Sequence, residues 1–308
     1  FPSDILQMTA VTVPMLLAEN KALDPLDALR TIAITDGIPE LVQLFDFQRT
    51  FAENLGLLFA QNSTYFRYAE SELRRHFRTP ETYNILLYGI ATGHNRISQL
   101  AEFSGFPQNK CDKYLKALDK AKLLETVQRK DTAGHVRTHY YPKGGYWKTW
   151  FRYVFPSQGR YMKPLEGDSL QQLADDIDRT IVAEYFKTVC WKWMRKNYGD
   201  YYWDEILRFD DPKQRDITVN GVHFDYVQET KDHTIYVKIW DDIGVGFPKA
   251  EFQKIETVTT KNRPFYENIY FLFSAGRACN YVEQVRNLET VSVVDLKSLL
   301  GQKNKELF

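Results

Sequence analysis

The chain has 308 residues, balances 40 Lys and Arg against 40 Asp and Glu, and is 44% hydrophobic. The zero net charge excludes a protein that attracts nucleic acid or acidic membranes through its overall field. The sequence has no apolar run of membrane-spanning length, no signal peptide and no zinc spacing among Cys111, Cys190 and Cys279. We therefore expect a cytoplasmic protein of two or three domains with buried free thiols and no membrane contact.

The first block, residues 1–79, is predicted to be a helical bundle. Asp24-Pro25 starts one helix, and the turn Gly37-Ile38-Pro39 opens another, because proline at the first helical position loses no hydrogen bond. Two further helices are predicted over residues 47–60 and 65–77.

The second block, residues 80–156, begins with the outline of a winged helix-turn-helix. Three short helical patterns follow Tyr83, separated by turns at Gly93 and at Gly105-Phe106-Pro107, and the third helix is predicted over residues 108–122. Two strand-like runs around Ala133-Gly134 then predict a hairpin, which would be the wing.

Positive charge is concentrated in this block. Between Lys110 and Arg137 there are eight Lys or Arg and four Asp or Glu. We expect one positive surface that contacts DNA phosphates, formed on the third helix and the hairpin by Lys110, Lys113, Lys116, Lys120, Arg129 and Lys130. The third helix lacks arginine and has few Asn or Gln, so double-stranded DNA would be bound weakly and without sequence preference. A merely solvated face, or a protein-binding module, is the alternative.

An aromatic strip with interleaved basic residues ends the second block, over residues 140–156. Such a strip either stacks on single-stranded bases or forms a helix whose rings are buried between domains, and the second is the commoner arrangement.

The third block, residues 157–308, is predicted to be α/β. A helix over residues 170–198 precedes two strands joined by Asn220-Gly221, a type I′ turn sequence. A strand over 234–239, a helix over 248–261, a strand over 268–274, a helix over 278–287 and a strand over 290–295 follow. This order is typical of a restriction-endonuclease-like mixed sheet flanked by helices.

The order of these features resembles the C-terminal half of the archaeal-type P-loop ATPases, a STAND/AAA-like group of prokaryotes. The resemblance is carried by Gly37-Ile38-Pro39-Glu40, the winged helix, the strip Trp150-Phe151-Arg152-Tyr153 and the αβββαβαβ tail. It implies that residues 1–79 are a helical lid, with Gly37 and Pro39 beside the nucleotide and Asp36 where glycine is common. ATP and Mg²⁺ would then belong to a P-loop domain preceding Phe1, since no Walker A sequence is present and this chain itself carries no cofactor.

The C-terminal module of that family is similar to PD-(D/E)xK nucleases, which need several carboxylates for Mg²⁺ and a lysine. The matching positions here are Lys187, Asp225, Tyr236 and Lys238, so lysine and tyrosine replace two of the acids. We expect a degenerate, metal-free site in which Asp225 and Lys238 share one face and form a buried ion pair, with Lys187 pointing toward them.

These observations predict a non-catalytic binding and assembly module of an ATPase, contacting DNA, a protein partner or a second copy of the chain. One alternative is a Mg²⁺-dependent nuclease using a displaced acid, Glu184 or Glu229. Another is an adaptor that binds only proteins.

Overall fold

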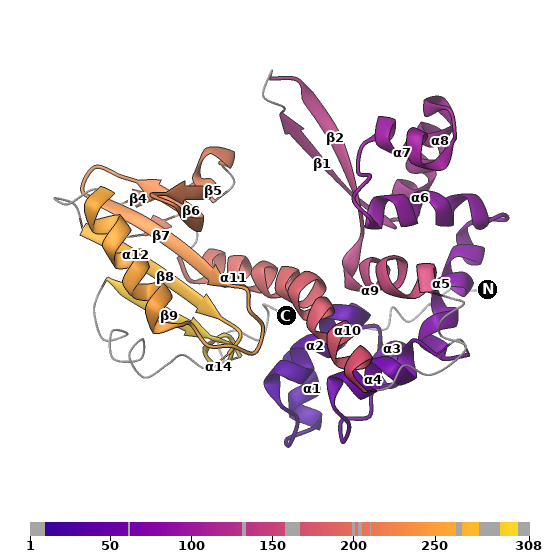
Figure 1. The fold of residues 1–308 in the computed structure, drawn as a ribbon, viewed down its shortest axis with the longest axis horizontal. Coiled ribbons are helices and arrows are strands. Elements are labelled where there is room, and N and C mark those ends of the chain that lie inside the picture. Colours follow the sequence, from indigo (N-terminus) through magenta and orange to yellow (C-terminus); the bar gives the residue numbers. More distant parts are fainter. Residues whose placement is uncertain are drawn as a thin grey trace, which may run out of the picture. The chain divides into compact units, whose positions relative to one another are not determined.

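The computed structural model describes residues 10–60, 62–130, 134–157, 167–198, 201–202, 205–209, 211–262, 267–276 and 290–300. The protein is mixed α/β and forms two compact units (Figure 1). The first unit contains Thr31–Ile177 with the residues up to Val11, and the second contains Thr12–Arg30 with Asp178–Phe308. The predicted blocks 1–79 and 80–156 therefore fall largely within one unit, and residues 12–30 belong with the C-terminal block.

The first unit consists mainly of helices. Its elements in chain order are the end of α2 (Pro25–Thr35), α3 (Pro39–Val42), α4 (Phe51–Leu58), α5 (Thr64–His76), α6 (Glu81–Ala91), α7 (Ile97–Ser104), α8 (Gln108–Lys120), the antiparallel hairpin of β1 (Leu124–Lys130) and β2 (Val136–Pro142), α9 (Gly144–Thr149), a π-helix (Trp150–Val154), a 3₁₀ turn (Phe155–Ser157) and α10 (Asp168–Ile177).

The start of α4 differs from the sequence expectation of residue 47. Thr50 accepts a hydrogen bond from the Glu53 backbone N–H, and the Glu53 carboxylate accepts one from the Thr50 N–H. This reciprocal capping satisfies two donors at the helix end and fixes the start at Phe51.

The three helices and the hairpin predicted after Tyr83 are present as α6, α7, α8 and β1–β2. Gly105, with φ 71°, ends α7 in the left-handed conformation that glycine adopts without penalty. Leu100 of α7 and Leu115 and Leu118 of α8 are buried, so apolar spacing identified the inner side of each helix correctly.

The aromatic strip is helical and buried. Tyr146, Trp147, Trp150 and Phe151 are each at most 8% exposed. The Trp150 Nε1–H donates to the Phe66 carbonyl at 3.1 Å. These rings are core residues of the first unit, so stacking on single-stranded bases by them is ruled out in this conformation.

The second unit is built on a five-stranded mixed sheet in the order β5-β6-β7-β8-β9. Its elements are α1 (Val13–Glu19), the start of α2, a π-helix (Asp178–Val182), α11 (Ala183–Tyr198), the short strands β3 (Tyr201–Tyr202) and β4 (Glu205–Ile206), a 3₁₀ turn (Pro212–Gln214), β5 (Arg215–Val219), β6 (Val222–Glu229), β7 (His233–Trp240), α12 (Lys249–Asn262), β8 (Glu267–Ser274), β9 (Val291–Asp295) and α14 (Leu296–Leu299). Strands β5, β6 and β7 are antiparallel, and β7, β8 and β9 are parallel.

Helices cover both faces of this sheet. Phe252 and Ile255 of α12 pack in one apolar cluster with Tyr270 and Leu272 of β8. The alternate β8 residue Phe273 meets Trp193 of α11, with ring centroids 5.5 Å apart. Successive residues of β8 therefore face α12 and α11 in turn, as a strand requires.

The predicted helix over 170–198 is interrupted by the π-helix Asp178–Val182. Asp178 is 7% exposed, and its carboxylate accepts hydrogen bonds from Arg30 Nε at 3.0 Å and Nη2 at 2.6 Å. A buried carboxylate requires such a partner, and neither the π-helix nor the pairing was predicted.

The predicted Asn220-Gly221 turn is present, with both residues at positive φ, as a type I′ turn needs. Cys111 and Cys190 are buried free thiols, as predicted. Cys279 and the predicted helix 278–287 lie outside the described residues. No helix in the described part of the chain has both the length and the apolar character to cross a membrane.

Candidate functional site

Three of the predicted DNA-contacting lysines share the outer face of α8. Lys113, Lys116 and Lys120 are exposed and recur at i, i+3 and i+7, which places them on one side of the helix. The opposite side carries the buried residues Cys111 and Leu115. Because the inner side is fixed in the core, the lysine side chains extend into solvent.

One of the three carries a local counterion. Lys116 Nζ lies 2.7 Å from the Asp112 carboxylate, an exposed i, i+4 pair. The hydrogen bond from Lys116 to Asp112 and the charge of Asp112 raise the pKa of Lys116, so its ammonium group stays charged at neutral pH. Exposed pairs of this kind are weak and exchange readily for another anion.

Lys110 does not belong to that face. Its Nζ lies 3.9 Å from the centre of the Phe106 ring and 5.8 Å from that of Tyr114, so it sits on the side of α8 near the preceding turn. A cation over an aromatic face is attracted by the ring quadrupole. Lys110 is exposed like the other three lysines, and the single positive surface expected from the sequence stays a prediction.

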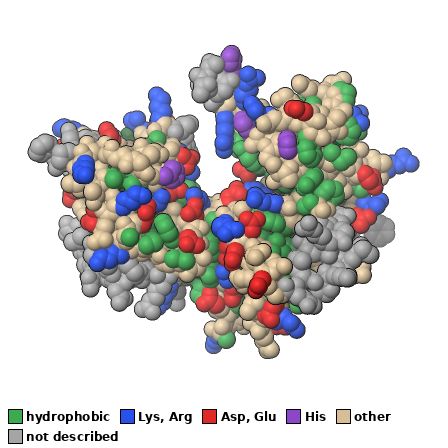
Figure 2. All heavy atoms as spheres, in the orientation of Figure 1, with side chains coloured by type: hydrophobic (Ala, Val, Ile, Leu, Met, Phe, Trp, Pro, Cys, Tyr) green, Lys and Arg blue, Asp and Glu red, His purple; other side chains and the backbone are tan. Residues whose placement is uncertain are grey.

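The hairpin contributes a separate group of cations (Figure 2). Arg129 of β1 is directly opposite Arg137 of β2, and both are exposed. Burial, and then the charges of Arg129 and Arg96, lower the pKa of the neighbouring His139. Residues directly opposite in an antiparallel pair share a face, so these two side chains lie on one face of the hairpin. The Lys130 backbone pairs with Val136, and its side chain lies outside the described residues.

These groups suit phosphate contacts better than base reading. Lysine ammonium groups bind phosphates as point charges without recognising a base. On α8 only Gln108 and Asn109, both exposed near its start, carry amide groups of the kind that recognise adenine.

The residues that the sequence matches to nuclease positions are partly brought together. Asp225 of β6 is 4% exposed, and its Oδ2 accepts a hydrogen bond from the Ile239 backbone N–H at 2.7 Å. Lys187 of α11 lies 3.3 Å from Asp225 Oδ1 and 3.4 Å from the Asp241 carboxylate. Lys187 therefore points toward Asp225 as predicted. Burial would lower the pKa of Lys187, but Asp225 and Asp241 outweigh it and raise that pKa above its ordinary value.

The predicted ion pair between Asp225 and Lys238 is wrong. Lys238 Nζ instead donates to the His223 carbonyl at 2.8 Å. Lys238 aligns with Leu272 in the parallel pairing of β7 and β8, so both side chains face α12. Asp225 faces α11, where it meets Lys187. The two residues thus lie on opposite faces of the sheet.

A local irregularity in β6 explains this difference. Phe224 and Val227 both belong to the cluster under α12, so two residues lie between them where regular alternation allows one. Asp225 and Tyr226 accordingly both face α11, the side on which Tyr226 contacts Trp191. The β5–β6 register is the same on both sides of Asp225, so no residue is inserted there, and the facing residue Asp216 of β5 has a positive φ of 54°.

Tyr236 also lies on the α12 face, in that same cluster and 1% exposed. It therefore fills core space on the face opposite Asp225. The prediction that it takes the place of a second metal-holding acid beside Asp225 is wrong.

Both displaced acids are at exposed positions. Glu229 is exposed and four residues from Asp225 along β6, roughly 13 Å at the rise of a strand. Glu184 is exposed, whereas Asp225 is buried. Within the described ranges, no three His, Cys, Asp or Glu side chains are grouped to hold a metal ion. Asp241 is the second partner of Lys187.

The turn at Gly37 and Pro39 is joined to other parts of its own unit. Asp36 accepts hydrogen bonds from the backbone N–H groups of Gly145 at 2.6 Å and Tyr146 at 3.1 Å, at the start of α9. The protein packed around the carboxylate raises the pKa of Asp36, although the residue is partly exposed, and the two hydrogen bonds and the charge of Lys148 lower it. A Cβ on Gly37 would lie 2.1 Å from the Val11 carbonyl oxygen. Close packing of the turn therefore accounts for the residue types found there, and a bound nucleotide is not needed to explain them.

Comparison of the chain with protein-family models, with curated proteins and with solved structures finds no match.

Proposed function

We propose that the chain is a binding and assembly module that holds double-stranded DNA through its phosphate backbone. The observation that carries this proposal is the exposed row of Lys113, Lys116 and Lys120 on α8, opposite the buried side of that helix. In this proposal α6, α7 and α8 with β1–β2 are a winged helix, α8 enters the major groove, and Arg129 and Arg137 of the wing meet neighbouring phosphates.

The C-terminal unit has no catalytic part in this proposal. Its strand order and flanking helices support a nuclease-like fold, but Asp225 is bound to Lys187 and to the Ile239 N–H. A carboxylate neutralised in this way is a poor ligand for Mg²⁺, which is held through carboxylates and waters in regular geometry. The order of motifs along the chain supports placing the module in the C-terminal region of a prokaryotic ATPase, where ATP and Mg²⁺ would be held by another domain.

The test is a fluorescence-anisotropy titration of a labelled duplex at low salt. The triple variant Lys113→Glu, Lys116→Glu, Lys120→Glu should lose binding. A matched triple variant, Lys231→Glu, Lys254→Glu, Lys261→Glu, changes the same charge at exposed positions of the other unit and should retain it. Equal loss in both variants would show only a net-charge effect. Unchanged binding by the α8 variant, or no binding by the parent, would favour an adaptor that binds only proteins.

A further inference from the structure

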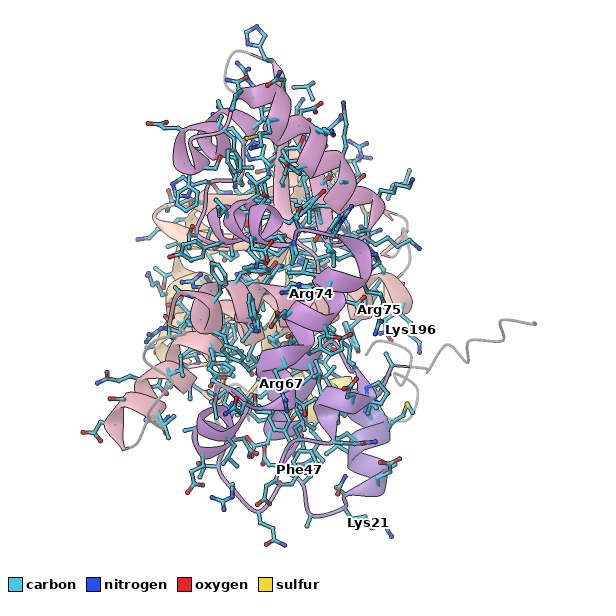
Figure 3. All side chains as sticks on the ribbon, turned by 90° about the vertical axis from the view of Figure 1, so that its right-hand side faces the viewer. Lys21, Phe47, Arg67, Arg74, Arg75 and Lys196 are labelled. Carbon is cyan, nitrogen blue, oxygen red and sulfur yellow. The ribbon has the colours of Figure 1, made fainter. Side chains whose placement is uncertain are left out.

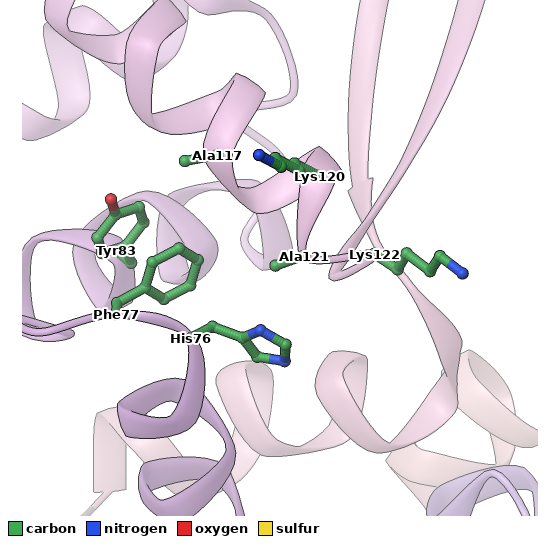
Figure 4. A pocket seen from close by; sticks show the side chains of 7 residues that line it. All are labelled: His76, Phe77, Tyr83, Ala117, Lys120, Ala121 and Lys122. Carbon is green, nitrogen blue, oxygen red and sulfur yellow. The ribbon is translucent and has the colours of Figure 1, made fainter. Parts of the chain in front are cut away.

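A groove opens between the end of α5, the start of α6 and the C-terminal end of α8 (Figure 4). Its volume is about 600 Å³, within the range of roughly 300–1,000 Å³ that is usual for ligand sites. All of its lining residues belong to the first unit: His76, Phe77, Tyr83, Ala117, Lys120, Ala121 and Lys122.

One side of the groove is aromatic. The rings of Phe77 and Tyr83 are stacked, with centroids 3.7 Å apart and planes at 16°. Tyr114 packs edge-on against Tyr83 and holds its orientation. The facing turn of α8 presents only the small side chains of Ala117 and Ala121, which leaves room for a flat group beside the rings.

The groove also carries positive charge without a lining carboxylate. Lys120 and Lys122 are exposed, and neither forms an ion pair with a described carboxylate. By contrast, Arg74 and Arg75 in the last turn of α5 are held by Glu70 and Glu72 (Figure 3). The two lysines are therefore available to an anion.

Lys122 occupies a position that favours glycine. It follows α8 with φ 59°, a left-handed conformation in which a lysine is strained. Strained residues persist where the surrounding structure requires them and are common at ligand sites. Lys122 lines the groove at its edge, and Figure 4 shows its side chain directed away from the rings of Phe77 and Tyr83.

We infer that this groove binds an unpaired nucleotide of a DNA strand, whose base stacks beside Phe77 and Tyr83 and whose phosphates meet Lys120 and Lys122. Base stacking on aromatic rings combined with backbone cations is the usual basis of single-strand binding. The inference rests on the proposed function, because Lys120 belongs both to the duplex-binding face of α8 and to the groove. A duplex with a single-stranded end would then occupy both sites at once.

The experiment compares a blunt duplex, the same duplex with a short single-stranded overhang, and the overhang sequence alone. Two variants address the groove and leave Lys113 and Lys116 intact. Lys122→Gly removes a charge and relieves the backbone strain, so it should fold at least as well as the parent. Ala117→Leu fills the groove from within a helix at little cost in helix propensity. Lys231→Gln is the charge-matched control at an exposed site of the second unit.

The parent should bind the overhang duplex about tenfold more tightly than the blunt duplex, as expected for stacking of one base. Both groove variants should lose this difference and keep the parent's affinity for the blunt duplex, and Lys231→Gln should retain it. If blunt duplex is bound and the overhang adds nothing, the groove inference is overturned and the proposed function stands. If only single-stranded DNA is bound and the groove variants abolish that binding, the groove inference is supported and the proposed duplex binding is overturned. Absence of binding to all three DNAs overturns both the groove inference and the proposed function. Binding of a labelled acidic peptide in place of DNA does the same.

Discussion

Replacing Lys187 by Met should destabilise the C-terminal unit, because it leaves the Asp225 carboxylate buried without its cation. Asp225 is 4% exposed, whereas the Lys187 side chain is 33% exposed. Breaking a fully buried pair costs about 3–5 kcal/mol. The exposure of Lys187 and the remaining Ile239 N–H hydrogen bond reduce this, so we expect a loss of about 2–3 kcal/mol.

The matched control is Lys238→Met. Lys238 contacts a backbone carbonyl and no described carboxylate, so its loss should change the free energy of unfolding by about 0.5 kcal/mol or less. Hydrogen exchange of peptides from β6 and β7 measures the unfolding of this unit separately from that of the other. A double-mutant cycle with Asp225→Asn should show coupling to Lys187 and none to Lys238.

The pH dependence gives a second check on the same pair. The pKa of Lys187 is raised in the folded protein, so its stabilisation is fully present below the ordinary lysine pKa of 10.5 and is lost as pH rises through the raised value. The difference between parent and Lys187→Met should therefore be constant at neutral pH and shrink only above about pH 10.5. The reasoning would be refuted if Lys238→Met strongly lowered the free energy of unfolding and Lys187→Met left it unchanged.

The remaining predictions concern the first unit and metal binding. Asp36→Ala removes the acceptor of two backbone N–H groups and should cost about 1–2 kcal/mol in thermal or urea unfolding, since the residue is partly exposed, with Asp36→Asn costing less because it keeps one acceptor. Since the pKa of Asp36 is raised, the parent should gain stability relative to Asp36→Asn as pH falls through that value, and a pH-independent difference would contradict this. Gly144→Ala would place a Cβ 2.2 Å from Asp36 Oδ2, so it should destabilise more than Gly105→Ala, which has a similar positive φ but open space; equal losses would show that the contact is unimportant. Calorimetric titration with Mg²⁺ or Mn²⁺ should be flat and DNA should remain uncut, whereas metal-dependent cleavage abolished by Asp225→Ala would restore the nuclease alternative.

Local periodicity was sufficient to predict most elements of the fold. The apolar spacing in α6, α7 and α8 identified the buried side of each helix, and Asn220-Gly221 identified a hairpin turn. The Thr50-x-x-Glu53 capping box was also readable and would have corrected the start of α4.

The candidate sites depended more on long-range packing. In β6, the run Phe224 to Val227 is buried on both faces, so the sequence could not reveal the break in alternation that turns Asp225 toward α11. The π-helix at Asp178 is paired with Arg30, nearly 150 residues earlier, and no local pattern indicates such a contact. The aromatic groove likewise joins residues from α5, α6 and α8 that are unremarkable in the sequence.

The salt dependence of duplex binding tests the central proposal most directly. With backbone contacts from α8, the logarithm of the association constant should fall linearly with the logarithm of salt concentration and be the same for unrelated sequences. The slope should decrease by roughly one for each of Lys113, Lys116 and Lys120 that is replaced by Gln. A slope that the three substitutions leave unchanged, or no binding by the parent at low salt, would contradict DNA binding by this face.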